Sequence, residues 1–350
     1  MSFAKIITII IFLLIIILVV LIFVYSQINP WQAVSTENGN ASSNLSGKLV
    51  FSCLVDSNWD VYSWSELDDQ VEVIVSGDQN ERQPAVTPKG DSLIYLLQDD
   101  SYNRLVNYFP ASGLKNNLVY SKNEITSFEI SPDGKKLLFS EMADEQNFLY
   151  FYDLIDDQLT NIAEGADSYE WFLDSGKFLY VIDGGVYLSN INSVTGKLDQ
   201  GQIIFDQAEN PVAIPGTTDQ FLALTQSDQG INLIILDSSS QEINLFSSLE
   251  FDLADPANFR MKYAPDQSSI LLVRANGQVT KRAEVWTIGR AGQEITGILS
   301  DIAQPVWSGN SQKIYYLKYD QELKSNIWSY DISEQNETKL TDFTNCSDLH

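Results

Sequence analysis

A short polar turn followed directly by an apolar strand recurs along most of this 350-residue chain and limits how it can fold. The clearest copy is Ser131-Pro132-Asp133-Gly134, in which Pro pre-sets φ, Asp bonds the turn through its side chain and Gly tolerates positive φ. The bulky run Leu137-Leu138-Phe139 follows and has the composition of a β-strand. The unit therefore predicts a chain reversal before each of many strands.

Copies of this turn return at intervals in the forties, each followed by three further short strand-like runs. The clear copies begin at Thr87, Ser131, Leu173, Pro215, Ala264 and Ser308, and a degenerate one begins at Ser46. A period of about 40–45 residues with four strands is typical of propeller blades, whereas a β-sandwich or solenoid does not require it. We predict an all-β, seven-bladed β-propeller, with six blades as the alternative.

Two longer stretches carry a family resemblance. Ser131-Pro132-Asp133-Gly134-Lys135 and Pro305-Val306-Trp307-Ser308, the latter with Ile327-Trp328-Ser329-Tyr330-Asp331 downstream, resemble the TolB-type WD-like β-propeller repeat. The resemblance extends from Ser46 to the end of the chain and implies a scaffold that binders and enzymes share. TolB carries an extra α/β domain before its propeller, for which this chain offers no room, so we do not expect a role in the Tol-Pal system.

The count of strands predicts how the ring closes. Seven apolar first strands are present, but only six innermost strands lie between them, so the seventh must come from the tail, residues 341–350. Beside 49–54, that tail would place Cys53 and Cys346 on neighbouring strands at a separation that suits a disulfide. We predict this bond as a staple that closes the propeller; two unpaired buried thiols are the alternative.

The N-terminus predicts the cellular location. Every residue from Ile6 to Val24 is apolar apart from Thr8, and about 20 such residues span a bilayer as a helix. This apolar run is longer than that of a cleavable signal peptide, and Lys5 before it favours a cytoplasmic N-terminus. We predict a transmembrane signal anchor at 1–26, a flexible linker at 27–45 and an extracytoplasmic propeller at 46–350 on the cell membrane.

Charge and composition exclude several classes of function. The chain has 21 Lys and Arg against 47 Asp and Glu, a net charge of −26 that repels nucleic acid. Its single histidine, His350, argues against Ser-His-Asp hydrolases and histidine-bound metals. We expect no nucleic-acid partner, and instead a protein or glycan of the envelope or cell surface.

One acidic loop comes nearest to a cation site. Asp56, Asn58 and Asp60 alternate as in Ca²⁺-binding loops, but the Gly and the distal Glu of such loops are missing. A solvated loop is the favoured interpretation. Ca²⁺ is therefore the one cofactor that we consider, and we expect no other.

No catalytic residue is predicted. The Ser-x-Asp-x-Gly-x-x-Trp box of sialidases and the Gly-x-Ser-x-Gly elbow of propeller-linked hydrolases are both absent. We predict a binding scaffold, with a carboxylate-dependent glycan hydrolase or lyase as the alternative. Tyr169, Trp171 and Trp307 are the candidate ligand contacts, although packing between blades is the favoured interpretation of all three.

Overall fold

The computed structural model describes residues 44–192, 195–228, 230–239, 243–250, 255–275, 282–343 and 345–350. The predicted anchor at 1–26 and nearly all of the predicted linker lie outside these ranges. Within them, no helix is both long and apolar enough to cross a membrane.

Strands dominate the described residues, and five of their sheets contain four antiparallel strands each. From inner to outer strand, these sheets comprise β27 (Cys346–Ser347), β1 (Leu49–Val55), β2 (Asn58–Ser65) and β3 (Gln70–Val75); β4 (Asn80–Val86), β5 (Leu93–Gln98), β6 (Asn103–Phe109) and β7 (Leu114–Ser121); β8 (Glu124–Ile130), β9 (Lys136–Ala143), β10 (Gln146–Asp153) and β11 (Gln158–Glu164); β12 (Ala166–Trp171), β13 (Lys177–Ile182), β14 (Gly185–Asn190) and β15 (Gln202–Phe205); and β16 (Glu209–Ala213), β17 (Gln220–Ser227), β18 (Gly230–Asp237) and β19 (Ile243–Leu249).

The remaining strands form one seven-stranded sheet, preceded by a 3₁₀ turn, η1 (Pro256–Asn258). Its strands are β20 (Phe259–Tyr263), β21 (Ser269–Ala275), β22 (Ala283–Gly289), β23 (Ile295–Trp307), β24 (Lys313–Tyr319), β25 (Ser325–Asp331) and β26 (Asn336–Lys339). β23 is long enough to serve two ladders: residues 295–302 pair with β22, and residues 303–307 pair with β24.

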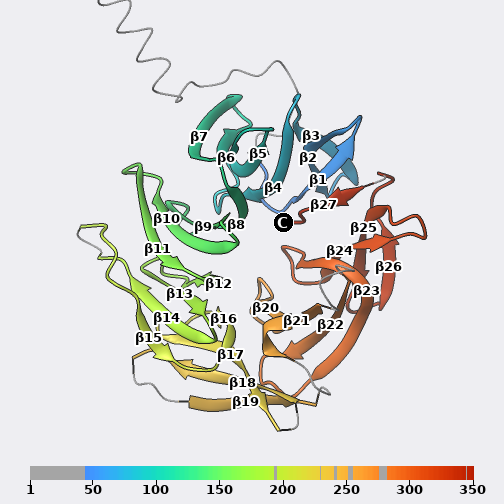
Figure 1. The fold of residues 1–350 in the computed structure, drawn as a ribbon. Helices are drawn as coiled ribbons and strands as arrows, with labels where there is room; N and C mark the ends of the chain where they lie inside the picture. Colours follow the sequence, from blue (N-terminus) through green and yellow to red (C-terminus); the bar gives the residue numbers. More distant parts are fainter. Residues whose placement is uncertain are drawn as a thin grey trace, which may run out of the picture.

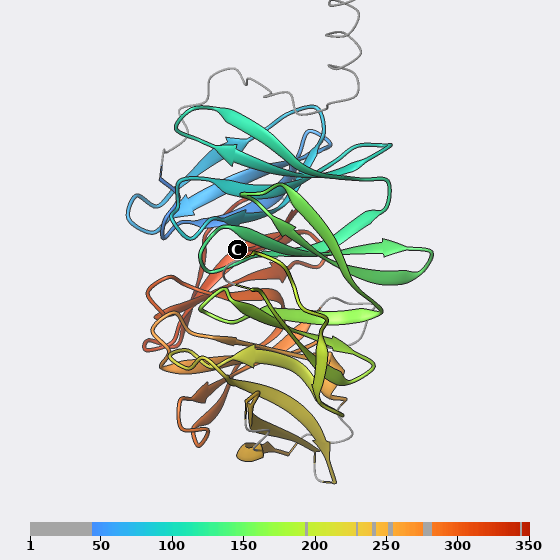
Figure 2. The same ribbon diagram turned by 90° about the vertical axis from the view of Figure 1, so that its left-hand side faces the viewer.

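The sheets stand around a common centre, as Figure 1 shows, and Figure 2 views the ring from its side. β4, β8, β12, β16, β20 and β27 are the strands nearest the centre, and the C-terminus lies among them (Figure 1). The all-β class expected from the repeat is confirmed.

The core lies between neighbouring sheets because the apolar strands alternate their side chains between two buried faces. In β9, Leu137 and Phe139 pack toward one neighbour with Ile94, whereas Leu138 packs toward the other with Phe178. Each sheet thereby contributes to two apolar clusters. This explains why the first strand of each repeat is apolar without interruption.

The recurring turn forms as expected and also links neighbouring sheets. The Ser131 hydroxyl donates to Asp133 at 2.6 Å, the backbone N–H of Gly134 donates to the Ser131 carbonyl, and Gly134 has φ of +70°. The N–H of Asp133 donates to the hydroxyl of Ser175, which belongs to the turn of the next repeat. That next turn begins at Phe172 rather than Leu173, because Phe172 makes the backbone bond that Ser131 makes in its own repeat.

The C-terminal tail closes the ring as the strand count predicted. β27 pairs antiparallel with β1, and Cys53 lies opposite Cys346 with a Cα–Cα distance of 4.1 Å. The predicted disulfide joins them and is buried, with exposures of 0% and 2%. Beyond it, Val50 and His350 exchange backbone hydrogen bonds, so the ladder continues past β27 toward the centre.

Candidate functional site at the centre of the ring

Three charged residues occupy the same register position on three different inner strands. Glu129, Glu170 and Lys262 pair with Leu138, Leu179 and Leu271, each of which lies two residues into its own strand. His350 joins them through its backbone bonds to Val50, the second residue of β1. We call Glu129, Glu170, Lys262 and His350 the central cluster.

Electrostatic interactions link the members of the central cluster. Burial raises the pKa of Glu129, and the Lys262 ammonium offsets part of that effect. Burial and then repulsion from Glu129 hold the pKa of Glu170 well above its ordinary value. Burial and Lys262 lower the pKa of His350 to about 4, so its imidazole is neutral at pH 7. Because β8 and β20 belong to sheets that are not neighbours, these charges can interact only across the centre.

None of the ion pairs within 4 Å among the described residues involves Glu129, Glu170 or Lys262. Titratable groups that lack an ion-pair partner and have perturbed pKa values, as Glu129 and Glu170 do, are typical of functional sites. The central cluster can therefore hold or exchange protons, or bind a polar ligand of mixed charge.

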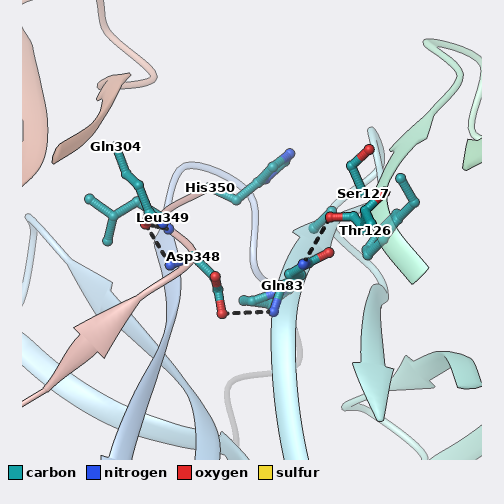
Figure 3. A pocket seen from close by; sticks show the side chains of 10 residues that line it. Gln83, Thr126, Ser127, Gln304, Asp348, Leu349 and His350 are labelled. Atoms are coloured by element: carbon teal, nitrogen blue, oxygen red, sulfur yellow. Dashed lines mark hydrogen bonds between the residues drawn. The ribbon is translucent and has the colours of Figure 1, made fainter. Parts of the chain in front are cut away.

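A pocket of about 260 Å³ lies beside the central cluster and shares His350 with it. Figure 3 shows Gln83, Thr126, Ser127, Gln304 and Asp348 around this pocket, from β4, β8, β23 and the tail. Gln83 and Gln304 each precede a proline and have φ of +49° and +48°, at β-bulges that interrupt their ladders. The bulges therefore place amide side chains where a regular strand would not.

Hydrogen bonds fix the polar wall of this pocket. Arg82 binds the Asp348 carboxylate through both oxygens at 3.0 and 3.3 Å, and the N–H of Gln83 donates to the same carboxylate. The Gln304 amide oxygen accepts from the N–H of Asp348 at 2.6 Å, and its nitrogen donates to Ser347. The tail that closes the ring is thus also one wall of the pocket.

The three aromatic residues that the sequence suggested as ligand contacts occupy different environments. Trp171 is 3% exposed, donates its indole N–H to the Glu129 carbonyl and contacts Phe178 edge-on at 5.3 Å, which is the packing role. Tyr169 is half-buried, and its hydroxyl bonds that of Ser127 at 2.7 Å, beside the pocket. Trp307 is half-buried and shares with His350 a second cavity of about 260 Å³.

Of the candidate Ca²⁺ ligands, Asp56 lies in the tight turn between β1 and β2, and Asn58 and Asp60 lie in β2 itself. Asp56 has φ of +48°, and the Asn58 amide nitrogen donates to the carbonyl of Gly77. One oxygen of Asp60 is buried without a partner among the described residues. Among all of the residues that the structure describes, no group of three or more His, Cys, Asp or Glu side chains is arranged to hold a metal ion. Ca²⁺ binding at Asp56, Asn58 and Asp60 stays a prediction.

The sequence reasoning missed the whole central cluster. It treated His350 only as evidence against histidine chemistry and did not single out Glu129, Glu170 or Lys262. A usable signal existed, because Glu129 and Lys262 both lie two residues before a turn that begins at Ser131 or Ala264. Glu170 escaped that alignment because its turn begins one residue earlier than its sequence suggests.

No protein-family model matches this chain, and no curated protein matches it. Solved structures do. TolB from Acinetobacter baumannii is 13% identical, with a TM-score of 0.56, over 93% of this chain and 69% of that one. The fold is a TolB-type β-propeller.

Two further propellers show how widely this fold is used. Oligogalacturonate lyase from Vibrio parahaemolyticus is 11% identical, with a TM-score of 0.56, over 88% of this chain and 85% of its own. The propeller domain of the Trilobed protease from Pyrococcus furiosus is 16% identical, with a TM-score of 0.51, over 75% and 82%. At these identities the likeness concerns the fold alone, so function must be argued from the site.

Proposed function

We propose that this protein is a membrane-anchored, extracytoplasmic β-propeller that binds a polar group of a protein or glycan partner at the centre of its ring. The observation that carries the proposal is the central cluster: charges from separate inner strands that form no ion pair and adjoin a polar pocket. A scaffold that needed only stability would gain from pairing or removing these charges.

The propeller is proposed to have seven blades. β23 supports this count, because its first part completes a ladder with β22 and its second part begins one with β24. The seven-stranded sheet is then two four-stranded blades that share β23, in addition to the five four-stranded sheets. Six blades would require that sheet to act as a single unit.

The anchor at 1–26 and an extracytoplasmic propeller also belong to this proposal. The apolar run at 6–24 supports the anchor. The disulfide between Cys53 and Cys346 supports the location, since such bonds persist outside the reducing cytoplasm. A protease added to intact cells should digest the propeller; complete protection while the disulfide is present would contradict the assigned orientation.

The binding role can be tested by proximity labelling with the full chain, comparing wild type with a Glu129→Gln/Glu170→Gln double variant. A Glu124→Gln/Glu294→Gln variant is the matched control, because it makes the same two substitutions at exposed positions, one on β8 and one in the turn between β22 and β23. We expect wild type and control to label the same partners and the central variant to lose them. Equal labelling by all three proteins would place the binding site elsewhere.

A carboxylate-dependent glycan hydrolase or lyase is the second candidate, and one observation favours it. Glu129 and Glu170 lie on adjacent inner strands, and repulsion between them helps to keep one protonated. A protonated and an ionised carboxyl side by side can serve as general acid and general base.

The enzyme reading has its own test. Glycan incubated with the full chain should yield new reducing ends or unsaturated products, and Glu129→Gln or Glu170→Gln should abolish turnover while binding persists. Binding without any product would favour the scaffold.

A further inference from the structure

A long groove runs along the outer rim of the molecule, away from the central cluster. It consists of two cavities of about 640 and 500 Å³ that share Thr160 and Leu198. One wall is β11, and the other comes from β13, β14 and residues 195–201, which precede β15. These strands belong to adjacent sheets, on the side of the ring that Figure 2 turns toward the reader. We call this feature the rim groove.

The aromatic wall of the rim groove is the half-buried Tyr187, and Tyr180, which is 4% exposed, packs against it. Tyr180 and Tyr187, from the neighbouring strands β13 and β14, stack with ring centroids 5.2 Å apart and planes 15° apart. Their position depends on Gly201, because a Cβ there would lie 1.9 Å from the Tyr180 hydroxyl oxygen. The chain thus keeps a residue without a side chain where the aromatic wall requires space.

The opposite wall and the floor offer uncharged hydrogen-bonding groups. Gln158, Thr160 and Asn161 on β11, and Gln200 across the groove, are all exposed. Their side chains make no hydrogen bond to any other described residue, so each is available to a ligand. Amides and hydroxyls that flank an aromatic surface suit a sugar chain, whose hydroxyl groups need partners and whose C–H faces pack on rings.

The charge of the groove narrows the class of sugar. Its charged lining residues are Asp153, Asp156, Glu164 and Asp199 against a single cation, Lys197. This excess of carboxylates repels uronic acids and sulfated or phosphorylated sugars. We propose that the rim groove binds an extended oligosaccharide that carries no acidic groups. This site is independent of the function proposed for the central cluster.

The test uses the full chain in a detergent without a sugar headgroup, titrated calorimetrically with the hexamer of N-acetylglucosamine. The hexamer of galacturonic acid is the probe of matched length with the opposite charge preference. We expect the neutral hexamer to bind at about millimolar concentration or below, and the acidic hexamer to bind at least about tenfold more weakly. Absence of binding by the neutral hexamer, or equal binding of both, would overturn the proposal.

Two variants locate the binding, and a third serves as the control. Tyr187→Ala removes part of the aromatic wall, and Gln158→Ala/Asn161→Ala removes two amides from exposed positions without disturbing the core; each should weaken binding about tenfold. Asn116→Ala removes an exposed amide from the outer strand β7 and should have no effect. If the double variant binds the neutral hexamer as wild type does, the groove is not the site, even where Tyr187→Ala fails to fold.

Discussion

Removing the disulfide tests how the propeller is held closed. The bond joins residues 293 positions apart, so breaking it releases almost the whole propeller from a covalent loop in the unfolded state. The loop-entropy relation gives about 6 kcal/mol for a loop of this length, and measured values usually fall below that figure. We therefore predict that Cys53→Ala/Cys346→Ala lowers the free energy of unfolding by roughly 3–5 kcal/mol.

The variant should nevertheless fold, because other contacts hold the tail. β27 keeps its ladder to β1, and the Arg82–Asp348 ion pair at 3.0 Å remains. Urea unfolding of the full chain should show an earlier midpoint and a larger m-value, since the unfolded chain is no longer cross-linked. Each single cysteine variant should lose nearly as much stability as the double variant, because either one removes the same bond.

Hydrogen exchange supplies the local part of the measurement. Amides of β27 and the following residues should lose more protection than those of β9 or β13, where no covalent closure is involved. The reasoning is refuted if the double variant unfolds within about 1 kcal/mol of wild type; an equal loss of protection in all sheets would mean that the tail opens only together with the rest of the propeller.

Three further predictions concern single buried groups. Glu81 is 2% exposed, and burial raises its pKa to about 7. Between about pH 4.5 and 7 the folded state therefore keeps a proton that the unfolded state has lost. The free energy of unfolding should fall by up to about 3 kcal/mol as pH rises through this range. Glu81→Gln should abolish that part of the slope in urea midpoints measured across this range, and an unchanged slope would contradict the assignment. Arg82→Met leaves the largely buried Asp348 carboxylate without its cationic partner and should lower the free energy of unfolding, measured by thermal unfolding, by about 3–5 kcal/mol. A loss below about 1 kcal/mol would mean that the ion pair is solvated. Trp171→Ala leaves a cavity at a buried position and should lower the free energy of unfolding by about 3–5 kcal/mol without changing ligand affinity. Unfolding and ligand binding are measured on the same variant. A loss of affinity at unchanged stability would mean that Trp171 is a ligand contact after all.

The fold was predictable because its information is local and repeated. The turn at Ser131, the apolar run after it and the spacing of the copies each follow from short-range chemistry. The structure realises them, except that the turns predicted at Leu173 and Pro215 each begin one residue earlier, at Phe172 and Ile214. The tail strand and the Cys53–Cys346 bond followed from counting strands, which is a topological rather than a local argument.

The central cluster could not be found in the same way. Its members are isolated residues with no motif around them, and only the ring brings Glu129, Lys262 and His350 together. Their shared register is visible in the sequence only once the first residue of each turn is known. At Phe172 that first residue is apolar and does not resemble a turn, so the alignment slipped by one and hid Glu170.

The closing tail joins stability to the proposed binding site, and this gives a last prediction. Asp348 and His350 line the central pocket, and both follow the strand that closes the ring. A ligand that contacts them is bound only while the tail is docked, so it must stabilise the docked state. A site-specific ligand at 100 times its Kd should raise the free energy of opening of the β27 amides by about 2.7 kcal/mol and so slow their exchange about 100-fold.

The disulfide decides how visible this effect is. In wild type the bond restrains the tail, so the β27 amides exchange only when the whole sheet opens, and the ligand's protection is not confined to the tail. In Cys53→Ala/Cys346→Ala the tail opens locally, so the β27 amides should gain the full protection, whereas β9 amides that exchange through local openings away from the pocket should gain none. Unchanged exchange of the β27 amides in this variant would mean that the ligand stays bound while the tail is open, and the pocket wall at Asp348 would then have no part in binding.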